Sequence, residues 1–92
     1  SLMHIFHHVL HEGIGLRQLL DYYYILRSLD KEQRGQVFEE MRNLDLAKFA
    51  EAVMYVEQQM FGLEPEFLLC KANERLGKLL LAEIERAGNF GQ

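Results

Sequence analysis

The sequence predicts an all-α fold, a compact bundle of about five helices with no sheet. Apolar residues recur at intervals of three and four through most of the chain, which is the pattern of helices with one buried face. No segment shows the strict alternation of apolar and polar residues that indicates a half-buried strand. Capping and helix-ending residues separate the apolar runs, so the connections are short, as in helical bundles.

The composition is that of a single globular domain, residues 1–92. Its 92 residues are 49% hydrophobic and 26% charged, without a low-complexity tract, repeat or Gly/Ser linker. The opening residues are already in helical rhythm and have no capping residue before them. We therefore expect the sequence to be a fragment of a longer chain.

Charge and cysteine content narrow the classes of partner. The net charge is −4 and the basic residues are scattered singly, so we expect no nucleic-acid binding by this segment alone. No apolar run reaches the roughly 18 residues of a membrane span, and we expect no membrane partner. Cys70 is the only cysteine and has no disulfide partner in the chain, which favours a cytoplasmic location.

The first predicted helix, from Leu2 to Glu12, carries every histidine of the chain on one stripe and ends at Gly13 and Gly15. Spacing of four places His4 beside His8 and His7 beside His11, close enough for each pair to contribute ligands to a transition metal. A polar face against another segment or solvent explains the same stripe. The Glu that usually follows the first His of a metallohydrolase helix is absent, and we assign no metal ligand.

The second predicted helix, from about Leu16 to Ser28, has apolar residues around most of its circumference, so we expect it to be central and buried on more than one side. A narrow polar stripe interrupts them. Its members share one line at intervals of four, three and four: Arg17, Asp21, Tyr24 and Ser28. Either Arg17 and Asp21 form an ion pair that braces the preceding turn, or the stripe faces a ligand cleft shared with another domain.

Two more helices follow. Asp30 is the expected cap of the third, which runs to about Asn43, with Gln33 reaching back to the cap. Its apolar face comprises Val37, Phe38, Met41 and Leu44. Asp45 is the expected cap of the fourth, Leu46 to about Phe61, and Gly62 is expected to end it in the left-handed conformation. The residues expected to point inward are Phe49, Ala50, Val53, Val56 or Met54, and Met60.

Residues 63–72 are the least regular part of the sequence and are expected to form a surface connection with Phe67, Leu68 and Leu69 tucked inward. Cys70 has no His or second Cys beside it and is interpreted as a small buried hydrophobe. Asn73 is expected to cap the fifth helix, which Gly88 closes. The core positions of this helix are Leu76, Leu79, Leu80, Ile84 and Ala87.

The chain lacks the motifs of a self-sufficient active site: it has no phosphate-binding glycine loop, nucleophile elbow, Asp-x-Asp pair or Cys-x-x-Cys. We therefore predict no catalytic residue within it. Four ordered segments are nevertheless distinctive: His8–Leu19, Asp21–Tyr22, Leu69–Lys78 and Ala87–Gly91. With their Gly-Ile-Gly-Leu-Arg-Gln-Leu and Ala-Gly-Asn-Phe-Gly strings, they resemble the C-terminal helical part of the uncharacterised bacterial nucleotidyltransferase family, which is well represented in Bacteroides-type bacteria.

The resemblance implies a catalytic α/β domain of the nucleotidyltransferase fold upstream in the parent chain, and implies Mg²⁺ and an NTP for the full-length protein, with no cofactor in this segment. The helical part would pack against that domain and close its nucleotide cleft. On this reading Arg17 would approach a phosphate or a catalytic carboxylate, and Asp21 would orient it. His8, His11 and Tyr24 would lie at the interdomain groove.

An alternative of a different class is a free-standing helical interaction module. In that case the spare apolar surface, including Phe6, Phe61 and Phe90, would be buried against a second copy of the chain or another protein. A mass in solution that rises with protein concentration would favour this homodimer reading. The acceptor substrate and the preferred nucleotide are not specified by the sequence under either reading.

Overall fold

The computed structural model describes residues 15–86 of the chain, and this part contains four α-helices, a short 3₁₀ helix and no strand. The all-α prediction is confirmed there. The first helix expected from the sequence, Leu2–Glu12, lies outside the described residues, so four helices are counted instead of five. Their bounds are α2 Leu16–Ser28, α3 Lys31–Asn43, α4 Ala47–Phe61, η1 Pro65–Phe67 and α5 Glu74–Arg86.

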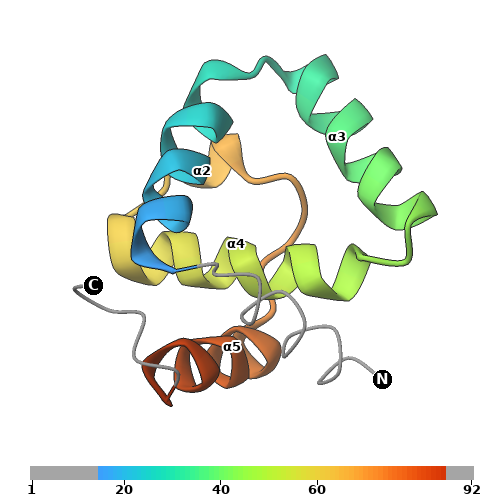
Figure 1. Cartoon of the computed structure of the whole chain (residues 1–92). Coiled ribbons are helices and arrows are strands. Elements are labelled where there is room, and N and C mark those ends of the chain that lie inside the picture. The colour runs from blue at the N-terminus through green and yellow to red at the C-terminus, as the bar shows by residue number, and fades with distance from the viewer. Residues whose placement is uncertain (1–14, 87–92) are drawn as a thin grey trace.

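Helix α4 occupies the middle of the arrangement (Figure 1). Helices α2 and α3 join it to form three sides of a triangle, and α5 lies against the opposite side of α4. The connection from α4 to α5, which includes η1, crosses the area that the triangle encloses before it reaches α5. Because α4 has neighbours on both sides, most of the core is built around it.

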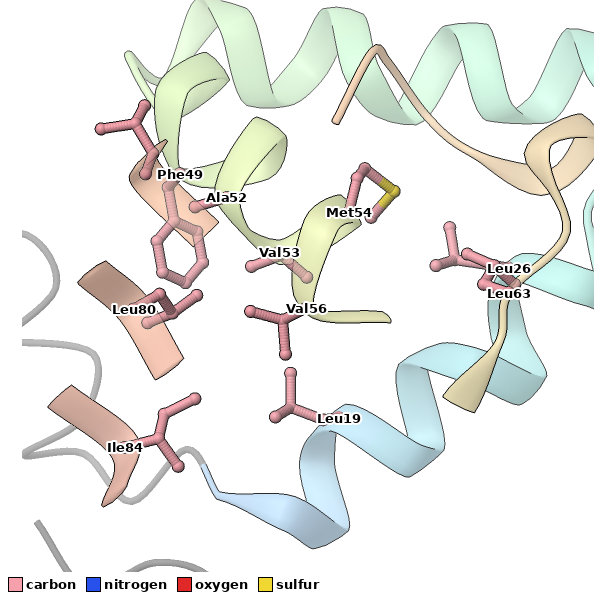
Figure 2. Close-up of a cluster of buried hydrophobic side chains, with 11 residues drawn as sticks. Leu19, Leu26, Phe49, Ala52, Val53, Met54, Val56, Leu63, Leu80 and Ile84 are labelled. Carbon is pink, nitrogen blue, oxygen red and sulfur yellow. The ribbon is translucent and has the colours of Figure 1, made fainter. Parts of the chain in front are cut away.

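The core consists of apolar side chains from every α-helix of the described part except α3 (Figure 2). Leu19 and Leu26 come from α2, and Leu80 and Ile84 come from α5. Helix α4 buries seven residues: Phe49, Ala50, Ala52, Val53, Met54, Val56 and Glu57. This confirms the predicted inward line of α4 except for Met60, which is half-buried, and adds Glu57, which the pattern did not mark.

Three of the predicted helix ends are confirmed. The Asp30 carboxylate accepts from the Gln33 backbone N–H at 2.8 Å, and the Gln33 side chain accepts from the Asp30 N–H at 2.9 Å. Gly62 ends α4 with φ of 67°. Asn73 caps α5, since its side-chain oxygen accepts from the Leu76 N–H at 3.0 Å. Each bond satisfies a backbone group that a helix end leaves unpaired.

The predicted cap of α4 is wrong. Asp45 has φ of 64° and lies in the turn after α3, and α4 begins one residue later than expected, at Ala47. The residue in the cap position is Leu46, which makes no side-chain capping bond. Asp tolerates the left-handed conformation better than most residues, so it suits the turn that reverses the chain here.

The predicted burial of α2 is also wrong. Only Leu19 and Leu26 of this helix are buried, while Ile25 is 52% exposed. Helix α2 lies at the edge of the described part and α4 is central. Two further core predictions fail for the same reason: Leu44 of the α3–α4 turn is 71% exposed and Leu79 of α5 is 39% exposed. Each is apolar and in phase with a helix, but no element among residues 15–86 packs closely enough to bury it.

Helices α4 and α5 pack closely. A Cβ placed on Gly77 of α5 would lie 2.3 Å from the Tyr55 ring, so the helices approach each other at a distance that only glycine permits. Asn73, just before the first residue of α5, stabilises the same interface. Its backbone N–H donates to the Glu51 carbonyl at 3.1 Å, and its side-chain amide donates to the Glu51 carboxylate at 3.2 Å.

Candidate functional site

The predicted polar stripe lies on the outer face of α2. Arg17, Asp21 and Tyr24 are all exposed, with Tyr24 at 63%. The helix begins after Gly15, whose N–H donates to the Gln18 side chain at 3.0 Å. Within the described residues Arg17 and Asp21 form no ion pair with each other, so the interpretation of a brace for the preceding turn is wrong. Both charges are available to a group outside this helix.

Large apolar side chains surround this stripe. Leu20, Tyr22 and Ile25 are exposed by 39%, 38% and 52%, which makes α2 the helix with the most exposed apolar residues in the described part. A mixture of exposed apolar, aromatic and charged side chains on one helix is typical of an interaction surface. We call the set Arg17, Leu20, Asp21 and Tyr24 the outer face of α2.

The predicted histidine positions cannot be compared with this surface, because His8 and His11 lie outside the described residues. The metal alternative for the histidine stripe therefore stays a prediction. Among residues 15–86, no group of three or more His, Cys, Asp or Glu side chains is placed to hold a metal ion.

An open cavity of about 340 Å³ lies between α2, α3 and α4. Its walls are almost entirely apolar. The lining residues are Tyr22, Ile25, Leu26, Leu29, Val37, Met41, Phe49, Ala50, Val53, Met54 and Leu69. A cavity of this size can hold a small molecule, but its walls offer nothing to a phosphate or a charged group. It is unsuited to nucleotide binding.

Glu57 is the only charged residue that is buried in the described part of the chain, and none of its surface is exposed. Within the part of the chain that the structure describes, neither oxygen of its carboxyl group has a hydrogen-bond partner. Burial raises the pKa of Glu57 to about 8, because the ionised form loses its hydration in an apolar environment. The side chain therefore carries a proton at neutral pH.

A cluster of arginine and aromatic side chains joins α2 to η1. The Arg27 guanidinium lies 5.4 Å from the Tyr23 ring centroid and 5.1 Å from that of Phe67, and it forms an ion pair with Glu64. This bond holds the pKa of Glu64 below its usual value. The Arg34 guanidinium of α3 also lies near the Phe67 ring, 5.7 Å from its centroid. The charges here are engaged within the protein, so the cluster stabilises the corner between the elements.

Cys70 fits its interpretation as a small hydrophobe. It is half-buried and free of any disulfide, and burial raises the pKa of its thiol to about 11. A thiol with a raised pKa holds little thiolate at neutral pH and is a poor nucleophile. The nearby Glu51 carboxylate raises the pKa of the thiol further.

Sequence reasoning missed Glu57 and Arg27. Glu57 falls four residues after Val53 and four before Phe61, so it shares a helical face with apolar residues, and that phase could have marked it as buried. Arg27 offered no such signal. Its partner Glu64 is 37 positions away along the chain, and only the fold brings them together.

Comparison with known proteins gives one match. Residues 1–62 match the family model described as "Uncharacterised nucleotidyltransferase", a segment that ends with α4. No curated protein and no solved structure matches the chain. Within the described residues, no helix combines the length and the apolar character that crossing a membrane requires.

Proposed function

This chain belongs to the uncharacterised nucleotidyltransferase family, and we propose that it is the helical part of a longer enzyme whose catalytic α/β domain lies upstream. That domain would transfer a nucleotidyl group from an NTP to an acceptor, using Mg²⁺ held by its own carboxylates. The chain would contribute a docking surface. The 92 residues alone would not catalyse the reaction, and the enzyme would act in the cytoplasm of a bacterium.

One observation carries the proposal: the outer face of α2 exposes large apolar side chains beside two charges that have no partner on their own helix. Isolated exposed hydrophobic residues are ordinary, but several on one helix favour burial against another surface. The stretch from Gly13 to Tyr22, which carries the resemblance to the family, runs directly into this face. We therefore propose that the outer face of α2 packs against the catalytic domain of the parent chain.

Arg17 is the residue of this face best suited to the nucleotide cleft. A guanidinium donates two parallel hydrogen bonds to a phosphate or a carboxylate, and Arg17 is exposed and has no carboxylate partner among residues 15–86. Asp21 and Tyr24 would provide polar contacts at the edge of the same interface. His8 and His11, which precede α2 in the sequence, would line the interdomain groove.

The test uses the full-length protein and measures pyrophosphate release from NTP and Mg²⁺. We expect Tyr24→Asp to reduce turnover and to separate the domains in small-angle X-ray scattering, because it places a charge in the interface. Leu44→Asp is the matched control, since Leu44 is equally exposed but lies in the α3–α4 turn. Equal effects of the two substitutions would contradict the assignment of the face.

Arg17→Ala tests the catalytic role separately. We expect turnover to fall while the scattering profile of the full-length protein stays that of the parent. Unchanged turnover would remove Arg17 from the nucleotide cleft without affecting the docking proposal.

The exposed face also fits a second candidate, a homodimer or interaction module. Phe61, which we expected to contribute to such a surface, packs against Tyr23 with ring centroids 5.8 Å apart. A dimer would therefore use the outer face of α2 in its place. The mass of the full-length protein in sedimentation, measured from low to high concentration, separates this candidate from interdomain docking, which predicts a monomer at every concentration.

A further inference from the structure

Glu57 lies on the side of α4 that faces α2. Three positions before it, Met54 lines the cavity together with residues of α2, and four positions after it, Phe61 packs on Tyr23 of α2. Residues at these spacings share one face of a helix. The side of α4 that meets α5 is a different one, since Tyr55 contacts Gly77 there. The carboxyl group therefore lies on the face of α4 that packs against α2 and against the α4–α5 connection, whose Leu69 N–H donates to the Met54 sulfur at 3.3 Å.

No group among residues 15–86 compensates the charge that the buried carboxyl would carry. Its oxygens have no hydrogen-bond partner, and burial, not a nearby charge, is what raises its pKa. On α2, Tyr23 presents a ring to Phe61, and Arg17 and Asp21 lie on the outer face. Among the charged side chains on the elements beside α4, Arg27 of α2 pairs with Glu64, Arg42 of α3 with Glu39, and Arg86 of α5 with Glu83. Glu66 and Lys71 of the α4–α5 connection are exposed.

Ionisation of Glu57 requires water, and of the two described helices that contribute to the core beside α4, α2 is held by fewer buried side chains than α5. Helix α2 buries only Leu19 and Leu26, whereas α5 buries Leu76, Gly77, Leu80 and Ile84. The cavity lies along one side of α2, so little packing is lost there when the helix moves. Elements with few buried contacts open at lower free energy than the core to which they are attached.

We propose that Glu57 is a proton-operated lock on α2: the neutral carboxyl keeps α2 seated on α4, and its ionisation releases α2 while α4 and α5 stay packed. The lock sits beneath the helix whose outer face we assign to the catalytic domain, but it is a property of this chain and does not depend on that assignment. Release of α2 would turn its outer face away from a bound partner.

Hydrogen exchange on the 92-residue chain, followed by mass spectrometry and corrected for the intrinsic rate at each pH, tests the lock. We expect protection of the amides of α2 to fall about tenfold per pH unit between roughly pH 5.5 and 7.5 and to level off above pH 8, since opening is linked to the release of one proton. In dilute urea, opening of α2 should depend less on denaturant than opening of α5, because it exposes less surface.

Glu57→Gln is the decisive variant, with Glu40→Gln, an exposed glutamate on α3, as the matched control. The first should remove the pH dependence of α2 and the second should retain it. Glu57→Met tests the same point with no polar group, should the amide prevent folding. The proposal is overturned if α2 and α5 open together with one urea dependence, or if α2 in Glu57→Met keeps the pH dependence of the parent.

Discussion

The two sides of α4 are packed differently. Toward α5 the surface is closed: a glycine lets the helices approach, and Leu76, Leu80 and Ile84 leave almost no exposed area. Toward α2 and α3 the surface holds an open apolar cavity and a buried carboxyl without a partner. Both sides derive from one amphipathic sequence pattern. The difference teaches that periodicity indicates which side of a helix is covered, but not how tightly.

The largest expected effect concerns the loosely packed side. The pKa of Glu57 in the folded chain, about 8, lies above the ordinary value of 4.5. The folded state therefore binds a proton more tightly than the unfolded state, and this stability is fully present below pH 4.5 and is lost as pH rises toward 8. We expect the parent to lose on the order of 4 kcal/mol relative to Glu57→Gln across this range, measured by urea denaturation.

The comparison with Glu57→Gln also cancels the opposite contributions of other carboxylates. Glu39, Glu64 and Glu74 have pKa values lowered by hydrogen bonds from Arg42, Arg27 and Lys78, so their stability is lost as pH falls, and it is the same in both chains. Parallel pH profiles of parent and variant would show that Glu57 is ionised in the folded state.

The next effect concerns the closed side. Leu80 has no exposed surface, so Leu80→Ala leaves a cavity between α4 and α5 and should lower the free energy of unfolding by about 3 kcal/mol. Leu79, the preceding residue of α5, is 39% exposed, and Leu79→Ala should cost less than about 1 kcal/mol. Equal losses in chemical denaturation would mean that α5 is seated differently on α4.

Two glycine substitutions, one at the closely packed α4–α5 interface and one outside it, should change the free energy of unfolding by smaller amounts. Gly77→Ala forces the Tyr55 ring to shift, which should outweigh the gain in helix propensity and cost about 1 to 3 kcal/mol. Gly35 of α3 is also helical but has no atom within 4 Å of an added Cβ, so Gly35→Ala should stabilise the chain by roughly 0.5 to 1 kcal/mol. Thermal unfolding followed by circular dichroism should show melting temperatures that move in opposite directions.

The smallest expected effect is a gain on the open side. Val37 is half-buried and lines the cavity, and Val37→Ile adds one methylene where space is available. We expect stabilisation of about 0.5 kcal/mol in urea denaturation. A loss would indicate that the side chains around the cavity are as closely packed as those between α4 and α5.

The sequence was sufficient to predict the helices and most of their ends, but not how the helices pack on one another. Asp30 with Gln33, Gly62 and Asn73 mark helix ends correctly because capping depends on neighbours within four residues. Asp45 failed because Asp suits both a cap and a left-handed turn, and the reversal after α3 decides between them.

Burial was harder to predict, because it depends on which element covers which face. Ile25 and Leu44 have the same apolar character as Leu26, yet the described elements leave both of them exposed. Glu57 was missed for the converse reason, because an acidic side chain is expected outside even where it shares a helical face with apolar residues. For the candidate site, the sequence identified Arg17, Asp21 and Tyr24 as one stripe, and the structure exposes all three; their roles stay predictions.

Asn73 has a consequence for how this chain tolerates insertions. The residue caps α5 and at the same time bonds both the backbone and the side chain of Glu51, so it fixes where α5 starts along α4 regardless of the path by which the chain arrives. Lengthening a loop is thermodynamically mild, about 0.6 kcal/mol for each doubling. Extra residues placed beside the exposed Lys71 should therefore leave the register of α5 on α4 unchanged, which makes this the natural point for a sequence of variable length.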